Sequence, residues 1–114
     1  MELQQPFLKL PWRFDAAQLA KEVEALPAGY WLDHPSGLAG NTAVPLVSVD
    51  GAMNNAFDGA MKPTDALLGS AYLHQVVASF DEVLARSRLM RLAPGAKVAE
   101  HVDFNYHWVS RVRI

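Results

Sequence analysis

The chain contains no cysteine, which excludes disulfide bonds and thiolate metal sites. Any metal site must therefore use histidine nitrogen and carboxylate oxygen. Histidine itself is scarce, because the 114 residues include four. Ligands of these types suit Fe(II), Mn(II) or Zn(II), and the sequence does not choose among the three metals.

The chain also lacks a large excess of either charge and any long apolar run. Its net charge is −2 with histidine neutral, which gives no strong attraction for nucleic acid or an anionic membrane. No apolar run approaches the roughly 20 residues that span a bilayer. Residues 1–5 lack the basic start and apolar stretch of a signal peptide. We therefore expect a cytoplasmic protein with neither a nucleic-acid nor a membrane partner.

What is present is typical of one globular domain. Hydrophobic residues make up 51% of the chain and charged residues 19%, as in soluble domains. The sequence shows no internal repeat and no low-complexity segment. A chain of this length can bury one modest core, so we expect residues 1–114 to form a single domain.

Helix signals lie in the N-terminal part of the chain. Asp15 is a suitable N-cap for an amphipathic helix over residues 15–26, and apolar spacing predicts a second helix over residues 72–80. Between them, residues 44–49 form a β-type run that ends at the turn signal Asp50-Gly51. The rest of this part is predicted as a short strand at 30–32, a loop over 33–43 and a long irregular connection over 51–63.

Strand signals dominate the C-terminal part. Residues 83–92 contain neither glycine nor proline and predict a long strand, and Pro94-Gly95 predicts a turn. Two further strands are predicted over residues 98–104 and 106–114. Mixed elements followed by consecutive antiparallel strands indicate the α+β class. We therefore expect an N-terminal α/β region over 1–82 that leads into core strands over 83–114.

A histidine and a carboxylate occur two residues apart within the predicted strand 98–104. Because side chains alternate along a strand, His101 and Asp103 should point to the same face. An imidazole and a carboxylate that converge in this way are two of the three ligands of a 2-His-1-carboxylate site for non-haem Fe(II). The tripeptide is short, and a lone histidine is more often a surface or core residue than a ligand.

Two arginines share one face of the predicted last strand. Arg111 and Arg113 alternate with apolar residues, and arginines that face a site can bind a carboxylate through two hydrogen bonds. Arg111 and Arg88 are equally well explained as solvated strand charges. A metal, a carboxylate-binding arginine and an apolar wall together describe a site for a small acid.

These motifs resemble one known family. Arg91-Leu92-Ala93-Pro94-Gly95, His101-Val102-Asp103 and Arg111-Val112-Arg113-Ile114, in this spacing, are similar to the aspartyl/asparaginyl β-hydroxylases, which include proline hydroxylases. The leading segments Leu10–Asp15, Gly40–Val49 and Ser70–Leu73 fit bacterial members as well. The family consists of Fe(II)- and 2-oxoglutarate-dependent dioxygenases with a double-stranded β-helix core of the jelly-roll or cupin-like kind.

The resemblance implies a function and a set of site residues. His101 and Asp103 would be Fe(II) ligands, and Arg113, with Arg111 beside it, would help to hold 2-oxoglutarate. No catalytic residue apart from the metal ligands is implied, and O₂ would be the second co-substrate. The substrate would be a small molecule or a peptide, hydroxylated at a free amino acid or at an Asp, Asn or Pro residue.

The resemblance also implies that part of the site is absent from the 114 residues. The family's second histidine ligand and its distal 2-oxoglutarate arginine match nothing in the sequence, because His34, His74 and His107 do not correspond to that ligand. We therefore expect an N-terminal portion of a hydroxylase, with an incomplete β-helix and little activity alone.

Two alternatives stay open. The chain is also compatible with a non-catalytic binding or assembly module, which would form an oligomer through an exposed strand edge. A Zn(II)- or Mn(II)-binding fold without redox chemistry is the third reading.

Overall fold

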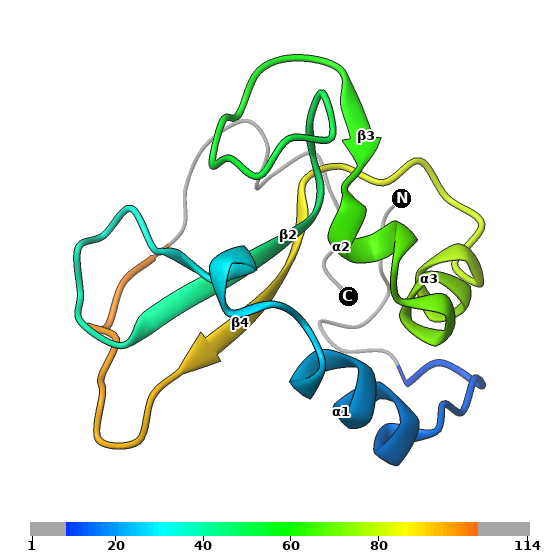
Figure 1. Ribbon diagram of the computed structural model, residues 1–114, viewed down its shortest axis with the longest axis horizontal. Helices are drawn as coiled ribbons and strands as arrows, with labels where there is room; N and C mark the ends of the chain where they lie inside the picture. Colours follow the sequence, from blue (N-terminus) through cyan, green and yellow to red (C-terminus); the bar gives the residue numbers. More distant parts are fainter. Residues whose placement is uncertain (1–8, 103–114) are drawn as a thin grey trace.

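The computed structural model describes residues 9–102, and the α+β class is confirmed (Figure 1). In chain order the elements are α1 (Ala16–Glu24), η1 (Ala28–Tyr30), β1 (Leu32–Asp33), β2 (Asn41–Val49), β3 (Met61–Pro63), α2 (Asp65–Leu68), α3 (Ala71–Ala78) and β4 (Ser87–Leu92). No helix in this part of the chain is long and apolar enough to cross a membrane. The predicted strand over 106–114 lies outside the described residues.

The sheet is antiparallel and is organised around β2. Thr42 and Ala43 of β2 pair with β1 and also with β4, so these two strands lie on opposite edges of β2. Val47 pairs with both β3 and β4, so β3 shares the edge of β1. The described residues therefore form an open sheet in which β2 is central.

A proline occupies the middle of the central strand. Pro45 has no N–H to give to a neighbouring strand, and proline within a sheet usually marks an edge or a bulge. The pairing of β2 with β4 shifts between Pro45 and Val47, where such an irregularity is needed. The carbonyl of Pro45 accepts a hydrogen bond from the Thr64 hydroxyl at 2.7 Å. The strand tolerates the proline because the register changes beside it.

Two predicted irregular segments contain strand residues. β2 begins at Asn41, inside the predicted loop, and β3 lies inside the predicted connection over 51–63. Pairing explains both differences, because Asn41–Ala43 gains partners from β4 and β3 pairs with the end of β2. The predicted Asp50-Gly51 turn is confirmed, with both residues at positive φ.

Two strand predictions in the C-terminal part need correction. Residues 83–86 are not in a strand, and β4 begins at Ser87. The chain leaves the sheet there because Arg86 is bound to the 52–57 loop, where its Nη1 donates to the carbonyl of Asn55 at 3.2 Å. The strand predicted over 98–104 is absent from its described residues, 98–102, which take part in no sheet pairing.

The two longer helices, α1 and α3, were predicted nearly as they occur, and a side chain of α1 caps the start of α3. Asp15 is the N-cap of α1, and its Oδ1 accepts from the N–H of Gln18 at 3.1 Å. Ser70, the N-cap of α3, makes no side-chain cap. Instead Glu22 of α1 accepts from the N–H groups of Tyr72 and Leu73, both at 2.8 Å. One carboxylate thus satisfies two N–H groups that a helix start leaves unpaired.

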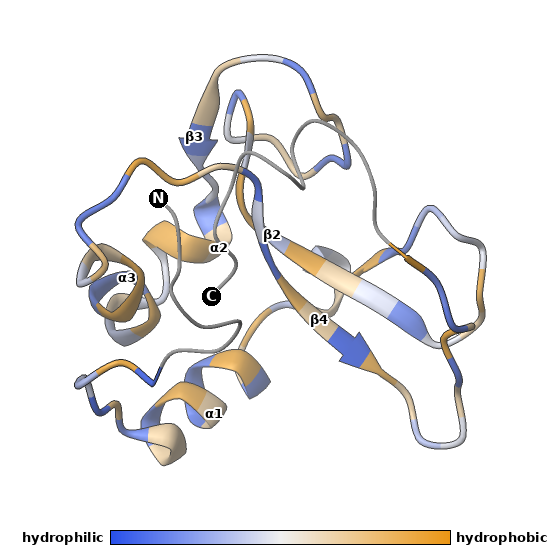
Figure 2. Cartoon of the chain, turned by 180° about the vertical axis from the view of Figure 1, so that it is seen from behind, coloured by the Kyte–Doolittle hydropathy of each residue, from blue (hydrophilic) through white to orange (hydrophobic). Residues whose placement is uncertain are grey.

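The hydrophobic core joins β2 to α2 and α3. Its buried members are Val44, Leu46, Val47, Ala66, Leu67 and Leu73. Figure 2 shows hydrophobic residues along β2 and on α2, which lies beside it. Leu19 of α1 and Leu89 of β4 pack against this core from the outside. The core is therefore assembled largely before β4 in the sequence.

Candidate functional site

The segment that carries His101 lies beside the loop that follows β1. After β4 the chain turns at Pro94-Gly95, where the N–H of Ala96 bonds to the carbonyl of Ala93 at 3.0 Å. The N–H of Ala93 bonds to the carbonyl of Gly40 at 2.9 Å. Both ribbon views show residues 97–102 running along the 34–40 loop (Figures 1 and 2). The predicted turn is confirmed, and it returns the chain toward His34.

His101 is exposed, and its ring has one defined contact with the backbone. Nδ1 lies 2.9 Å from the carbonyl oxygen of Ala99. Because a carbonyl oxygen only accepts, Nδ1 must carry the proton in this contact. In that tautomer the ring lone pair is on Nε2. Histidine ligands of metals commonly donate the other ring N–H to a backbone carbonyl or a carboxylate in this way.

The other predicted site residues cannot be placed around His101. Asp103, Arg111 and Arg113 lie outside the described residues. Within residues 9–102 there is no group of three His, Asp or Glu side chains that would hold a metal ion. His101 is thus the single predicted ligand for which the structure gives a local geometry, and that geometry fits a metal-binding imidazole.

His34, which falls in the predicted loop over 33–43, is close enough to His101 to feel its charge. Its Nδ1 accepts from the N–H of Ser36 at 3.2 Å and lies 2.9 Å from the Ser36 hydroxyl. Burial lowers the pKa of His34, and the charges of Arg88, Arg86 and His101 lower it further. The neutral ring is therefore favoured, with its proton on Nε2. In this state His34 is a hydrogen-bond donor rather than a metal ligand.

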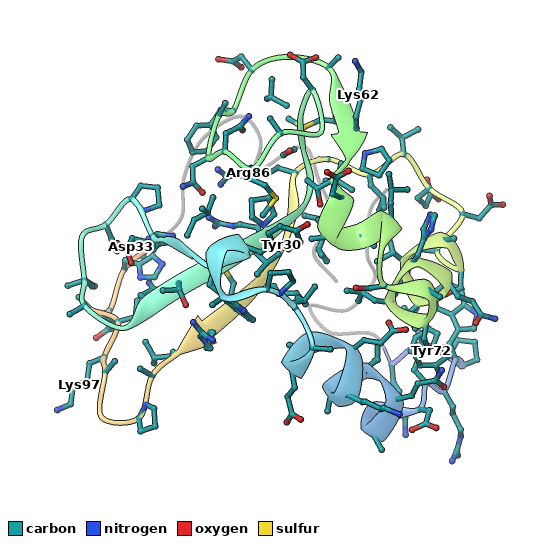
Figure 3. All side chains as sticks on the ribbon, viewed as in Figure 1. Tyr30, Asp33, Lys62, Tyr72, Arg86 and Lys97 are labelled. Atoms are coloured by element: carbon teal, nitrogen blue, oxygen red, sulfur yellow. The ribbon has the colours of Figure 1, made fainter. Side chains whose placement is uncertain are left out.

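Arg86 is a partly buried cation at the start of β4. Its guanidinium carbon lies 4.1 Å from the centre of the Phe57 ring, and one N–H reaches the Asn55 carbonyl. Burial lowers the pKa of Arg86, with a further contribution from Arg88. Figure 3 shows Arg86 and Asp33 on the part of the molecule away from Tyr72 and the α1–α3 contact. An arginine in this environment remains charged at neutral pH.

Strand register separates the arginines of β4. Ala43 of β2 pairs with Leu32 of β1 and with Met90 of β4, so these three side chains share one face of the sheet. Pro45 pairs with Arg88, and because side chains alternate along a strand, both lie on that same face. Leu89 and Arg91 are on the opposite face. Arg91 lies 4.0 Å over the Trp31 ring, and its Nε donates to the Thr42 hydroxyl at 3.2 Å.

Sequence reasoning missed His34 and Arg86 because their neighbours are distant in the chain. His34 is brought to the site by β1 pairing, since its N–H donates to the carbonyl of Asn41 at 2.9 Å. Arg86 was assigned to a strand that does not include it. The alternation of Arg86, Arg88 and Met90 was the one available signal, and it gave no information about the loop beyond β1.

Comparison with known proteins adds no assignment. No family model, no curated protein and no solved structure matches this chain.

Proposed function

We propose that the chain contributes metal ligands and co-substrate contacts to a non-haem Fe(II)- and 2-oxoglutarate-dependent dioxygenase. The observation that carries the proposal is the 2.9 Å contact between Nδ1 of His101 and the Ala99 carbonyl oxygen, which favours the tautomer with the proton on Nδ1. The His101-Val102-Asp103 spacing and the Arg-Leu-Ala-Pro-Gly turn that precedes it support the same reading. Nitrogen and carboxylate oxygen are the ligands that this class of iron site uses.

Each residue has a defined task in this proposal. His101 would bind Fe(II) through Nε2, and the bond from Nδ1 to Ala99 would fix the orientation of the ring. Asp103 would supply the carboxylate ligand, and Arg113 and Arg111 would hold 2-oxoglutarate. Bound Fe(II) would supply the activation of O₂ and the oxidative decarboxylation that hydroxylation of a C–H bond requires. The substrate would be an amino acid, free or within a peptide.

The proposal includes a limit on activity. The family resemblance assigns two ligands within these 114 residues, and two ligands hold Fe(II) more weakly than three. We therefore expect weak Fe(II) binding and little succinate formation from this chain alone. The complete β-helix core is part of the proposal and would need strands after β4.

Anaerobic equilibrium dialysis against Fe(II) tests the assignment of His101. His101→Ala should weaken Fe(II) binding by at least about tenfold, comparable to the loss of a group that orients a ligand. His74→Ala is the matched control, because His74 is also exposed but lies on α3. It should leave the affinity within about twofold. Equal binding by the wild type and His101→Ala would contradict the proposal.

A second candidate function is a binding or assembly module. The exposed apolar side chains of Met90 and Leu92 on β4 favour it, because they lie on a strand whose described pairing is with β2 alone. Light scattering over a range of protein concentrations separates the two readings. A concentration-dependent oligomer that Met90→Ser disrupts, together with no Fe(II) binding, would favour the module.

A further inference from the structure

A cavity lies where α1, η1, α2 and the start of α3 meet. It has a volume of about 220 Å³ and opens to solvent. Its polar lining residues are Glu22, Tyr30, Asp65 and Ser70, of which Tyr30 is labelled in Figure 3 and belongs to η1. Among the described residues that line it there is none of β4 and no His101. The cavity is therefore a second place in the fold, apart from the His101 segment.

Ser70 is buried at this cavity and its hydroxyl is not used by the helix that follows. The residue is 5% exposed and is the N-cap of α3. A serine at an N-cap normally accepts from the N–H of the second or third helical residue. Those two groups, of Tyr72 and Leu73, bond to Glu22 instead. Within residues 9–102 the Ser70 hydroxyl has no hydrogen-bond partner, so a group bound in the cavity would gain one there.

The charge around the cavity is negative. No lysine, arginine or histidine occurs among its described lining residues, whereas Glu22 and Asp65 both line it. Each oxygen of Glu22 accepts one N–H, and a carboxylate can accept about four hydrogen bonds, so Glu22 keeps acceptor capacity. In the described part of the chain Asp65 takes part in no ion pair. The C-cap of α1, Ala25, also lines the cavity, and the C-terminal end of a helix favours a cation.

We propose that this cavity binds a primary ammonium group on an apolar stem, from either a free polyamine or a lysine side chain of a partner protein. An ammonium group has three N–H donors and no acceptor, and Ser70, Glu22 and Asp65 supply three acceptors. Ala25 and Leu26 supply apolar contact for the stem. Drug-sized ligands occupy pockets of about 300 Å³ or more, so this cavity suits a smaller group. The inference goes beyond the proposed function and does not rest on it.

Titration of the full 114-residue chain with n-butylammonium chloride, followed through its amide NMR signals, tests the site. The amide signals of Leu26, Gly69 and Ser70 should shift in a saturable manner, because these residues line the cavity. Two control compounds separate the parts of the probe. Tetramethylammonium has the charge without N–H donors, and n-butanol has the stem without the charge. Neither should produce a saturable shift of the same signals.

Two further probes identify the source of the ammonium group. Nα-acetyl-lysine amide presents a lysine side chain, and spermidine presents a free polyamine. Tighter binding of the lysine derivative would assign the cavity to a partner protein, and tighter binding of spermidine would assign it to a small molecule.

Matched variants make the test specific. Asp65→Asn should weaken n-butylammonium binding by at least about fivefold, because a hydrogen bond to a charged group is lost. Asp58→Asn, at an exposed carboxylate outside the cavity, should bind like the wild type. Ser70→Ala should weaken binding by at least about threefold, the loss of a neutral hydrogen bond. Its thermal midpoint should stay at the wild-type value, because the hydroxyl caps nothing in α3.

Three results would overturn the inference. One is the absence of a saturable shift with n-butylammonium, or an equal shift with tetramethylammonium. Another is equal weakening by Asp65→Asn and Asp58→Asn. The third is wild-type affinity in Ser70→Ala. None of these results bears on His101, whose Fe(II) binding is decided by dialysis.

Discussion

The two halves of this molecule use their polar side chains differently. In the helical half, polar groups hold backbone: Glu22 caps α3, Asp15 caps α1, and Thr64 caps α2 while it bonds to Pro45. In and just before β4, Arg91 and Arg86 lie over the rings of Trp31 and Phe57, and Arg86 is close enough to Arg88 to feel its charge. The first pattern stabilises helix ends, whereas burial and the charge of Arg88 disfavour the charged form of Arg86.

Burial differs between the core, formed by β2, α2 and α3, and strand β4. Leu46 and Leu67 are 4% and 2% exposed, whereas Met90 and Leu92 are 52% and 49% exposed. Substitutions in the two halves should therefore affect different measurements. Changes in the core should reduce stability, and changes at His101 should reduce Fe(II) binding.

The largest effect on stability is expected for Leu46→Ala. Removal of a buried leucine side chain costs about 2–5 kcal/mol, because apolar contacts are lost and a cavity remains. Leu92→Ala, at a half-exposed position, should cost less than about 1 kcal/mol. Urea unfolding of both variants measures the difference. Similar losses in the two variants would show that β4 belongs to the same core.

Glu22→Ala should have the next largest effect. The carboxylate caps α3 through two N–H groups, and loss of a cap of this kind costs about 1–2 kcal/mol. Glu24→Ala is the matched control, since Glu24 is exposed on the same helix. Thermal unfolding should show a lower midpoint for Glu22→Ala alone. A wild-type midpoint for this variant would mean that α1 and α3 are held by apolar packing.

Gly40→Ala should reduce stability and also disturb the turn over residues 93–96, which precedes His101. Gly40 has a φ of +79°, and an added Cβ would lie 2.9 Å from Cβ of Ala96 and 3.0 Å from Cβ of Ala93. The left-handed backbone alone costs about 1–2 kcal/mol for a residue with a side chain. The clash would also push the 93–96 turn away from β2. Chemical shifts of Ala99 and His101 should change, whereas those of α3 should not.

The smallest effect is expected for His34, and it concerns the pH dependence of folding stability. Because its folded pKa is lowered, the folded chain binds this proton less readily than the unfolded chain. Neutral His34 therefore contributes to the stability of the fold above the unfolded pKa of about 6.5. That contribution is lost as the pH falls through the lowered pKa of the folded state. The wild type should therefore lose more stability than His34→Gln between pH 7.5 and pH 5. Equal losses would contradict the direction of the shift.

Sequence reasoning predicted the elements whose signals are local. The Asp15 cap, the two longer helices and the Pro94-Gly95 turn each depend on a few neighbouring residues, and all are confirmed. It failed where distant pairing decides the structure. Asn41 joins β2 through β4, and residues 83–86 leave the sheet because Arg86 binds a loop about 30 positions earlier.

The candidate site divides in the same way. The His101-Val102-Asp103 tripeptide was visible as a local motif, but its predicted strand is absent over 98–102. The influence of Arg86 and Arg88 on the pKa of His34 was not predictable, because segments distant in the sequence must fold together before their charges interact.

Paramagnetic broadening by Mn(II) tests most directly where the metal site lies. Mn(II) accepts the same nitrogen and carboxylate ligands as Fe(II) and is stable in air. Substoichiometric Mn(II) should broaden the amide signals of Ala99, Glu100 and His101 first, and His101→Ala should abolish this pattern. Broadening centred on α1 and α3, or unchanged in His101→Ala, would contradict the assignment of metal binding to the His101 segment.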